Sequence, residues 1–253
     1  MHRSRLAILV GGSALALSAC GAAVSPAPVS YSQADMDDYI TAAVVSPARP
    51  AQDSARDEAR KPEEIVAFSG VQRGDVIAEI APGGGYYTRI LSQTVGPEGK
   101  IYALMPAFFA NRPGGLDGIN AIAEQYGNVE VVVVEGYDTL SLPEPVDLVW
   151  TTENYHDLAN GDVAATNRWA FSALKPGGIY FVEDHSAPGT GLSATSTLHR
   201  IDPAAVREQV TSAGFALEAE SDALHNPDDP HTASPREFDG VSDKFAYRFR
   251  KPQ

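Results

Sequence analysis

The stretch DVIAEIAPGGGYYTRIL, residues 75–91, begins as an apolar strand and continues as a helix, with Gly83, Gly84 and Gly85 at the bend. Glycine lets a backbone turn sharply and lets a ligand approach the main chain, although it costs about 0.5–1 kcal/mol in regular structure. Ligands of open α/β sheets bind at the carboxyl ends of the strands, and the N–H groups that begin the next helix favour an anion. This glycine turn therefore predicts a ligand site after the first strand; the alternative is a tight turn without a ligand.

Strands and helices alternate from residue 74 onward. The strands are continuous Val- and Ile-rich runs, which is typical of a parallel sheet buried on both faces. We predict an α/β fold with a doubly wound, mostly parallel seven-stranded sheet over residues 74–253, and added N-terminal helices over residues 35–73. The expected strands cover 74–81, 99–106, 128–136, 146–152 and 178–185, with a closing pair in 215–224 and 244–251; the expected helices lie near 86–95, 117–126, 162–174 and 202–214.

The beginning of the chain has the composition of an export signal. MHRSR supplies two arginines, a short apolar run follows, and LSAC ends at Cys20, the only cysteine. The run is too short to span a bilayer and is typical of a secretory signal, here residues 1–19. LSAC resembles the lipobox of bacterial lipoproteins, in which the cysteine is lipidated. We expect residues 20–34 to be a lipidated cysteine with a flexible tether, and the exported chain to be a membrane-anchored lipoprotein facing the periplasm. An ordinary signal peptide that happens to contain a cysteine is the alternative.

The charge of the chain bears on its partners. There are 19 basic and 33 acidic residues, for a net charge of −14. A strongly negative protein repels nucleic acid, and the sequence has no basic patch interleaved with aromatic residues. We therefore expect no nucleic-acid partner.

The glycine turn does not match a dinucleotide-binding fingerprint. That pattern is G-x-G-x-x-G with an acid about twenty residues further on. Here Tyr86, Tyr87 and Thr88 follow the glycines, and the second predicted strand ends at Met105 and Pro106 with no acid. NAD is therefore disfavoured.

Three segments together resemble the class I S-adenosylmethionine-dependent methyltransferases. They are EIAPGGGYYT (79–88), VDLVW (146–150) and ALKPGGIYFVED (173–184). More narrowly, KPEEIVAFSGVQRGD, ENYHDL and HRIDPAAVREQVTSAGF resemble a group of exported bacterial predicted methyltransferases. The resemblance implies a Rossmann-like methyltransferase fold, S-adenosylmethionine as methyl donor and a small-molecule acceptor.

The resemblance also implies positions for the donor. Gly83 and Gly85 would lie against its aminoacyl part, and Glu79 would meet its amino group. Tyr87 either offers its ring to the sulfonium cation or packs under the turn. Met105 stands where family members usually carry an acid that holds the ribose. The implied donor-binding residues are Glu79, Ala81, Pro82, Gly83, Gly84, Gly85, Tyr87 and Met105.

Histidines and acids collect after the predicted strands. Methyl transfer to oxygen or nitrogen needs a deprotonated acceptor, and a histidine is a suitable general base near pH 7. We expect His156 to be this base, with Tyr155 or Glu153 orienting it and Asp184 and His185 beside it. The alternative is that these histidines are satisfied by hydrogen bonds in loops. The segment HNPDDPHT (225–232) is rich in turn formers and is expected to be a loop over the site.

A metal site is a competing interpretation of the same region. It would use Asp184, His185 and one of His199, His225 or His231. The histidines lack a tight H-x-x-x-H spacing, so no metal is expected. Two alternatives to methyl transfer remain: a binding protein that keeps the fold without transfer activity, and a metal-dependent hydrolase that uses the His/Asp cluster.

Overall fold

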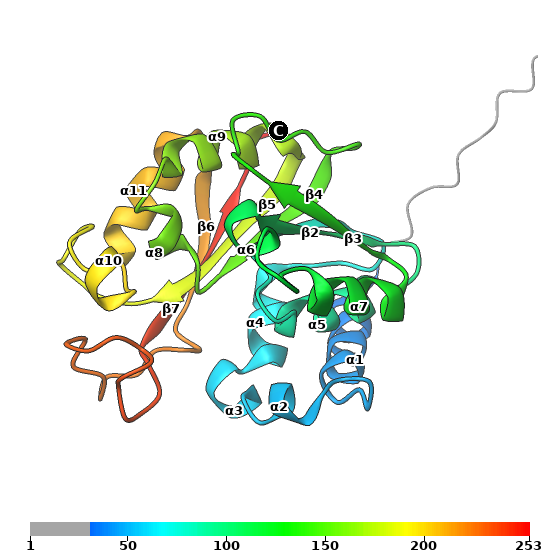
Figure 1. Ribbon diagram of the computed structural model, residues 1–253, viewed down its shortest axis with the longest axis horizontal. Coiled ribbons are helices and arrows are strands. Elements are labelled where there is room, and N and C mark those ends of the chain that lie inside the picture. The colour runs from blue at the N-terminus through cyan, green and yellow to red at the C-terminus, as the bar shows by residue number, and fades with distance from the viewer. Residues whose placement is uncertain (1–30) are drawn as a thin grey trace, which may run out of the picture. The chain divides into compact units, whose positions relative to one another are not determined.

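The computed structural model describes residues 31–253, in which a central sheet lies between two layers of helices (Figure 1). The expected signal, Cys20 and the first part of the tether lie outside the described residues. No helix within residues 31–253 is long and apolar enough to cross a membrane. The strands of this part are β1 (Val76–Ile80), β2 (Lys100–Pro106), β3 (Val129–Val134), β4 (Val146–Thr152), β5 (Leu174–His185), β6 (Ala216–Ser221) and β7 (Lys244–Arg250).

The order of the strands is β3-β2-β1-β4-β5-β7-β6. All neighbours pair in parallel except β7, which is antiparallel to both β5 and β6. The chain moves outward from β1 in one direction and returns to its other side at β4, so the topological switch point lies between β1 and β4. The predicted fold class, a doubly wound, mostly parallel seven-stranded sheet, is confirmed.

Helices cover both faces of the sheet because side chains alternate along each strand. From β1, Ile77 packs in the core beneath one layer, and Ala78 and Ile80 pack in the core beneath the other. The first layer contains α1 (Gln33–Val44), α4 (Pro62–Ser69), α5 (Tyr86–Val95) and α7 (Asp117–Tyr126), and the second contains α8 (Tyr155–Leu158), α9 (Val163–Ala173) and α11 (Pro203–Ser212). The remaining helices are short: α2 (Ala51–Ser54), α3 (Asp57–Arg60), α6 (Ala107–Ala110) and α10 (Thr195–Leu198).

Two features of the fold differ from the sequence-based expectation. Strand β5 begins at Leu174 rather than at residue 178, because Leu174 pairs with Val146 before the register shifts and the ladder continues. The KPGG segment that usually separates a helix from a strand is therefore part of the strand. The second difference is the set of one-turn helices α6, α8 and α10, which have no apolar period long enough to be recognised in a sequence.

Candidate functional site

The glycine turn, residues 81–85, lies at the switch point and opens to space. Backbone φ is +49° at Ala81, +56° at Gly83 and +78° at Gly85, which is the left-handed region that favours glycine. A Cβ built on Gly83 or Gly84 would meet no atom within 4 Å. A Cβ on Gly85 would instead lie 2.2 Å from Cδ1 of Ile122. Gly85 is therefore required for close packing of α7, whereas Gly83 and Gly84 face open space.

Hydrogen bonds fix the shape of the turn without using its outer N–H groups. The N–H of Gly85 donates to the carbonyl oxygen of Pro82 at 2.9 Å. The side chain of Asn154 donates to the carbonyl of Ala81 at 3.3 Å, which links the turn to the loop after β4. Within residues 31–253 the N–H groups of Gly83 and Gly84 have no hydrogen-bond acceptor. These two donors are available to an anion.

Glu79 lies on β1, close to the turn, and is only 2% exposed. Its carboxylate accepts a hydrogen bond from Oγ1 of Thr88 at 2.6 Å. Burial raises the pKa of Glu79 to about 7, and the opposing effects of Thr88 and Arg89 are smaller. The carboxyl group thus carries a free-energy cost when it is ionised, which a cationic ligand would relieve.

Two implied donor-binding residues lie in the core. The ring of Tyr87 packs 5.0 Å from that of Trp150 and 4.8 Å from that of Tyr86, measured between ring centroids. Tyr87 therefore packs under the turn, the second of its two expected positions, and does not present its ring to the open side. Met105 is also buried, in the apolar cluster beneath α5.

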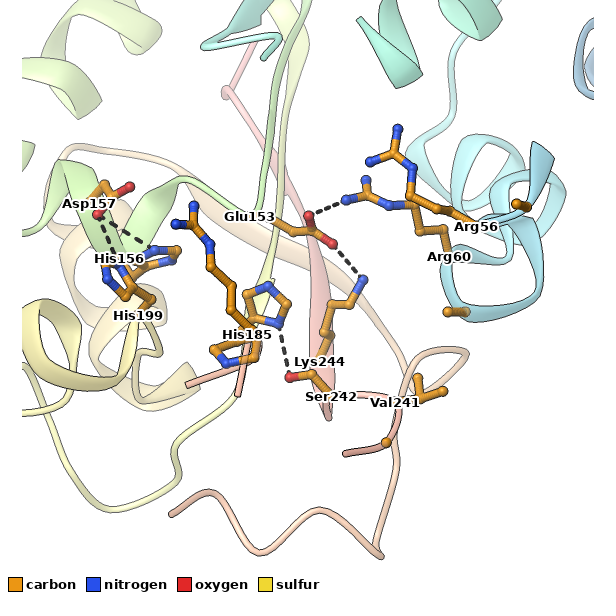
Figure 2. Close-up of a pocket in the computed structure, with 15 residues that line it drawn as sticks. Arg56, Arg60, Glu153, His156, Asp157, His185, His199, Val241, Ser242 and Lys244 are labelled. Carbon is orange, nitrogen blue, oxygen red and sulfur yellow. Dashed lines mark hydrogen bonds and ion pairs between the residues drawn. The ribbon is translucent and has the colours of Figure 1, made fainter. Parts of the chain in front are cut away.

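A pocket of about 430 Å³ lies at the carboxyl ends of β4 and β5, beside α3 and the beginning of β7 (Figure 2). Its polar and charged lining comes from Arg56, Arg60, Glu153, His156, Asp157, His185, His199, Arg236, Ser242 and Lys244. The segment that closes it is 235–242 rather than the expected loop 225–232. His225 and His231, which belong to that loop, instead bind the carboxylate of Asp243 at 2.9 and 2.8 Å.

Asp184 holds His156 in a single orientation. One carboxylate oxygen lies 2.8 Å from Nδ1 of His156, and the other accepts the backbone N–H of His156 at 2.7 Å. Burial alone would lower the pKa of His156, but the hydrogen bond and charge of Asp184 raise it above its usual value. Because Nδ1 faces Asp184, Nε2 is the ring atom left for the pocket.

The other residues expected beside His156 have different surroundings. Tyr155 is fully buried and its hydroxyl accepts a hydrogen bond from Asn167 at 2.8 Å, so Asp184 and not Tyr155 orients His156. His185 lines the pocket, with Nδ1 2.9 Å from the hydroxyl of Ser242. Burial lowers the pKa of His185 to about 4, so the ring is neutral near pH 7.

Glu153 belongs to a chain of ion pairs rather than to the His156 pair. Its carboxylate binds Arg60, and its other oxygen lies 2.7 Å from Nζ of Lys244 (Figure 2). Lys244 also lies 3.1 Å from Glu183, which is fully buried. Burial raises the pKa of Glu183 to about 7, whereas Lys244 and Arg60 overcome the effect of burial on Glu153 and hold its pKa well below the usual value. The backbone of Glu153 is left-handed, with φ +55°.

Arg60 and Lys244 were missing from the residues expected in the site. The signal for Lys244 in the sequence was its place at the beginning of the last predicted strand. Because β7 is antiparallel to β5, the first residue of β7 lies beside the last residue of β5, His185. Assigning the direction of β7 would have placed Lys244 in the site. Arg60 comes from an N-terminal helix, and its position follows only from tertiary packing.

His156, Asp157 and His199 form a cluster of three donor atoms within 4.8 Å of one another. Nε2 of His156 and Nδ1 of His199 each lie 3.6 Å from one oxygen of Asp157 (Figure 2). This three-donor cluster differs from the metal ligands considered in the sequence analysis. Asp184 binds Nδ1 of His156 and is not part of the cluster, and the carboxylate of the cluster is that of Asp157.

Arg200, the arginine next to His199, has a structural role. It is fully buried, pairs with Asp229 at 2.8 Å and donates to the carbonyls of Ala233 and Ser186. No part of its guanidinium is available to a substrate.

No family model matches this chain. A protein-L-isoaspartate O-methyltransferase of Ignicoccus hospitalis is 27% identical to it over 130 residues, which are 49% of this chain and 54% of the relative. The chain thus spans about half the length of this curated relative.

Solved structures agree with the topology. An S-adenosylmethionine-dependent methyltransferase from Aquifex aeolicus superposes with a TM-score of 0.57 at 17% identity, covering 88% of this chain and all of that one. Another, from Mesorhizobium loti, superposes with a TM-score of 0.56 at 18% identity, covering 76% of this chain and 97% of that one. Together with the strand order and the glycine turn at the switch point, these likenesses show that the chain has the fold of the class I S-adenosylmethionine-dependent methyltransferases.

Proposed function

We propose that this protein transfers a methyl group from S-adenosylmethionine to a small molecule. The observation that carries the proposal is the open glycine turn at the switch point, with Glu79 close to it and a polar pocket nearby. The name of the Ignicoccus hospitalis relative, an O-methyltransferase, supports the same class of reaction.

The residues of the turn fit the aminoacyl part of the donor. The N–H groups of Gly83 and Gly84 would bind its carboxylate, since backbone donors before a helix favour an anion. Glu79 would pair with its ammonium group, directly or through a water molecule, and the ammonium charge would stabilise the ionised carboxylate. Ala81 and Pro82 give the turn its shape. When bound, the donor supplies a methyl group already activated by the positive charge on sulfur.

The acceptor would occupy the pocket, whose volume suits a small molecule. His156 would contact the acceptor through Nε2, because Nδ1 is held by Asp184. Asn154 connects the two parts of the site, since it follows β4 and binds the carbonyl of Ala81. Placing donor and acceptor next to each other would provide most of the rate, because the methyl group needs little further activation.

Gly84→Asp is expected to weaken binding of S-adenosylhomocysteine, the demethylated donor, by about 100-fold or more, because a carboxylate on the turn repels that of the ligand. The fold should survive, since a Cβ at Gly84 meets no atom within 4 Å. Isothermal titration calorimetry measures the affinity and thermal unfolding the fold. Gly118→Asp is the matched control: this exposed glycine in the first turn of α7 also has open space around its Cβ. Equal affinities of the Gly84 and Gly118 variants would contradict the proposal.

A binding protein without transfer activity is the second candidate. Met105 favours it, because a buried thioether at the end of β2 offers no acid to the ribose of the donor. Radiolabelled S-adenosylmethionine, incubated with the chain and a metabolite extract, separates the two candidates. Label that moves to an extract component in the wild type but not in Gly84→Asp supports transfer, whereas binding without movement of label supports the second candidate.

We also propose that the chain is exported and anchored through a lipid on Cys20. The proposal is supported by the basic start, the short apolar run and the LSAC sequence. In a Gram-negative host, the wild type is expected in the membrane fraction with incorporated radiolabelled palmitate. Cys20→Ala should lose the label and the membrane association. Wild-type protein that carries no label would overturn the anchoring.

A further inference from the structure

We propose that His156, Asp157 and His199 form a binding site for a divalent transition-metal ion such as Zn²⁺ or Co²⁺. Two imidazoles and one carboxylate are a donor set that suits these ions. His156 and Asp157 belong to α8, and His199 directly follows α10. The fold therefore brings His199 to the other two residues, although it is far from them in the sequence.

The distances fit a single ion. Ligand atoms at about 2.1 Å from one ion lie roughly 3–4 Å from one another. The oxygen of Asp157 lies 3.6 Å from the nitrogen of each histidine, and all three donor atoms lie within 4.8 Å of one another. An adjustment of the side chain of His199, which is 45% exposed, would bring its Nδ1 into the same range of Nε2 of His156.

The lone pairs of the cluster are free to bind an ion. Within the described residues, Nε2 of His156, Nδ1 of His199 and the carboxylate of Asp157 make no hydrogen bond, since both 3.6 Å contacts are too long for one. His199 also has a left-handed backbone, with φ +50°, which costs free energy in a residue with a side chain. A bound ion would offset this cost.

Asp184 gives the site a supporting shell. It is fully buried and accepts from Nδ1 of His156 at 2.8 Å. A histidine that binds a metal usually donates its second ring N–H to a carboxylate, which fixes the tautomer and makes the ligating nitrogen more basic. Asp184 and His156 have the geometry of the carboxylate and the histidine in such an arrangement, with Nε2 of His156 directed to the cluster.

The ion would be accessible from the pocket, because all three of its ligands line it (Figure 2). Three protein ligands leave at least one coordination position open. This consequence rests on the proposed function, whereas binding of the ion does not: the open position would take a hydroxyl oxygen of the acceptor and lower its pKa. In that state His156 is a metal ligand and not a general base, and the acceptors are alcohols, phenols or enols.

Metal binding by the full-length chain, produced without a histidine tag and stripped with dipicolinate, tests the proposal. Zn²⁺ is titrated by calorimetry and Co²⁺ by its visible absorption. We expect one ion per chain, and Co²⁺ bands whose intensity indicates four or five ligands. His199→Ala should weaken binding by about 100-fold, and Asp184→Asn by about 10-fold or more.

His225→Ala is the matched control, because this histidine binds a carboxylate outside the pocket. Its affinity for Zn²⁺ should equal that of the wild type. A wild type that binds no ion, or a His225 variant that loses as much affinity as the His199 variant, would overturn the metal site. Calorimetry with S-adenosylhomocysteine on the same variants separates the two proposals: donor binding that persists in His199→Ala leaves the proposed function intact whatever the metal result.

Discussion

Replacing Lys244 by methionine is expected to lower the free energy of unfolding by about 3 kcal/mol at pH 8. Breaking a buried ion pair by removing one partner leaves an uncompensated charge, and such changes cost roughly 3–5 kcal/mol. Lys244 is the cation between Glu153 and Glu183, at 2.7 and 3.1 Å, and its side chain is 5% exposed. Without it, Glu183 must take up a proton or stay buried as an anion.

The loss should be clearly smaller at pH 5. The pKa of Glu183 is raised, to about 7, so its carboxyl group is protonated at pH 5 in the variant and largely so in the wild type. Urea unfolding at both pH values measures the difference. The double variant Lys244→Met/Glu183→Gln should recover most of the stability at pH 8, because the unpaired carboxylate is gone.

Lys100→Met provides the control for this prediction. It removes the same charge from an ion pair with Glu130 whose two side chains are 38% and 49% exposed. Exposed pairs contribute about 0–1 kcal/mol, so the control should lose little. A Lys244 variant that is no less stable than this control at pH 8 would show that the ion pairs of Lys244 with Glu153 and Glu183 do not stabilise the fold.

Glu79→Gln is expected to gain stability relative to the wild type as the pH rises from 5 to 8. The pKa of Glu79 is about 7 in the folded chain, against an ordinary value of 4.5. A raised pKa in the folded state gives stability that is present below pH 4.5 and lost as the pH rises through 7. Glutamine does not titrate. The difference in free energy of unfolding between the variant and the wild type should therefore change by about 2–3 kcal/mol between pH 5 and pH 8.

The same substitution is expected to weaken binding of S-adenosylhomocysteine by about 10-fold or more, because the ligand's ammonium group loses its ionised partner. Urea unfolding and calorimetry on one pair of proteins therefore give opposite signs: the stability of the variant relative to the wild type rises between pH 5 and pH 8, whereas its affinity for the ligand falls. Thr88→Val is a suitable control, since it removes the hydrogen bond to Glu79 and leaves the carboxylate. A stability difference that is independent of pH would contradict the burial of an ionisable Glu79.

The fold could be predicted from the sequence because its signals are local. The apolar run of β1, the glycine turn and the Val-rich β3 each show their secondary structure within about ten residues. Pro62 begins α4, at the first helical position, where a proline is tolerated. Boundaries set by pairing were not predictable: Leu174 joins β5 because Val146 lies opposite it.

The candidate site was only partly predictable, because residue type does not give the direction of a side chain. Tyr87 follows the glycine turn, and Met105 lies near the end of β2, yet both side chains point into the core. Asp184 was expected beside His156, and the structure gives it the orienting role that the sequence assigned to Tyr155 or Glu153. The position of Arg60 beside Glu153 carried no sequence signal, because it depends on tertiary packing alone.

A crystal structure of the chain grown with S-adenosylhomocysteine would show whether the glycine turn binds the donor. We expect density for the ligand at the glycine turn, its carboxylate within hydrogen-bond distance of the N–H groups of Gly83 and Gly84 and its ammonium group facing Glu79. Crystals in which the turn remains bare at saturating ligand, or in which the ligand binds elsewhere, would contradict the account.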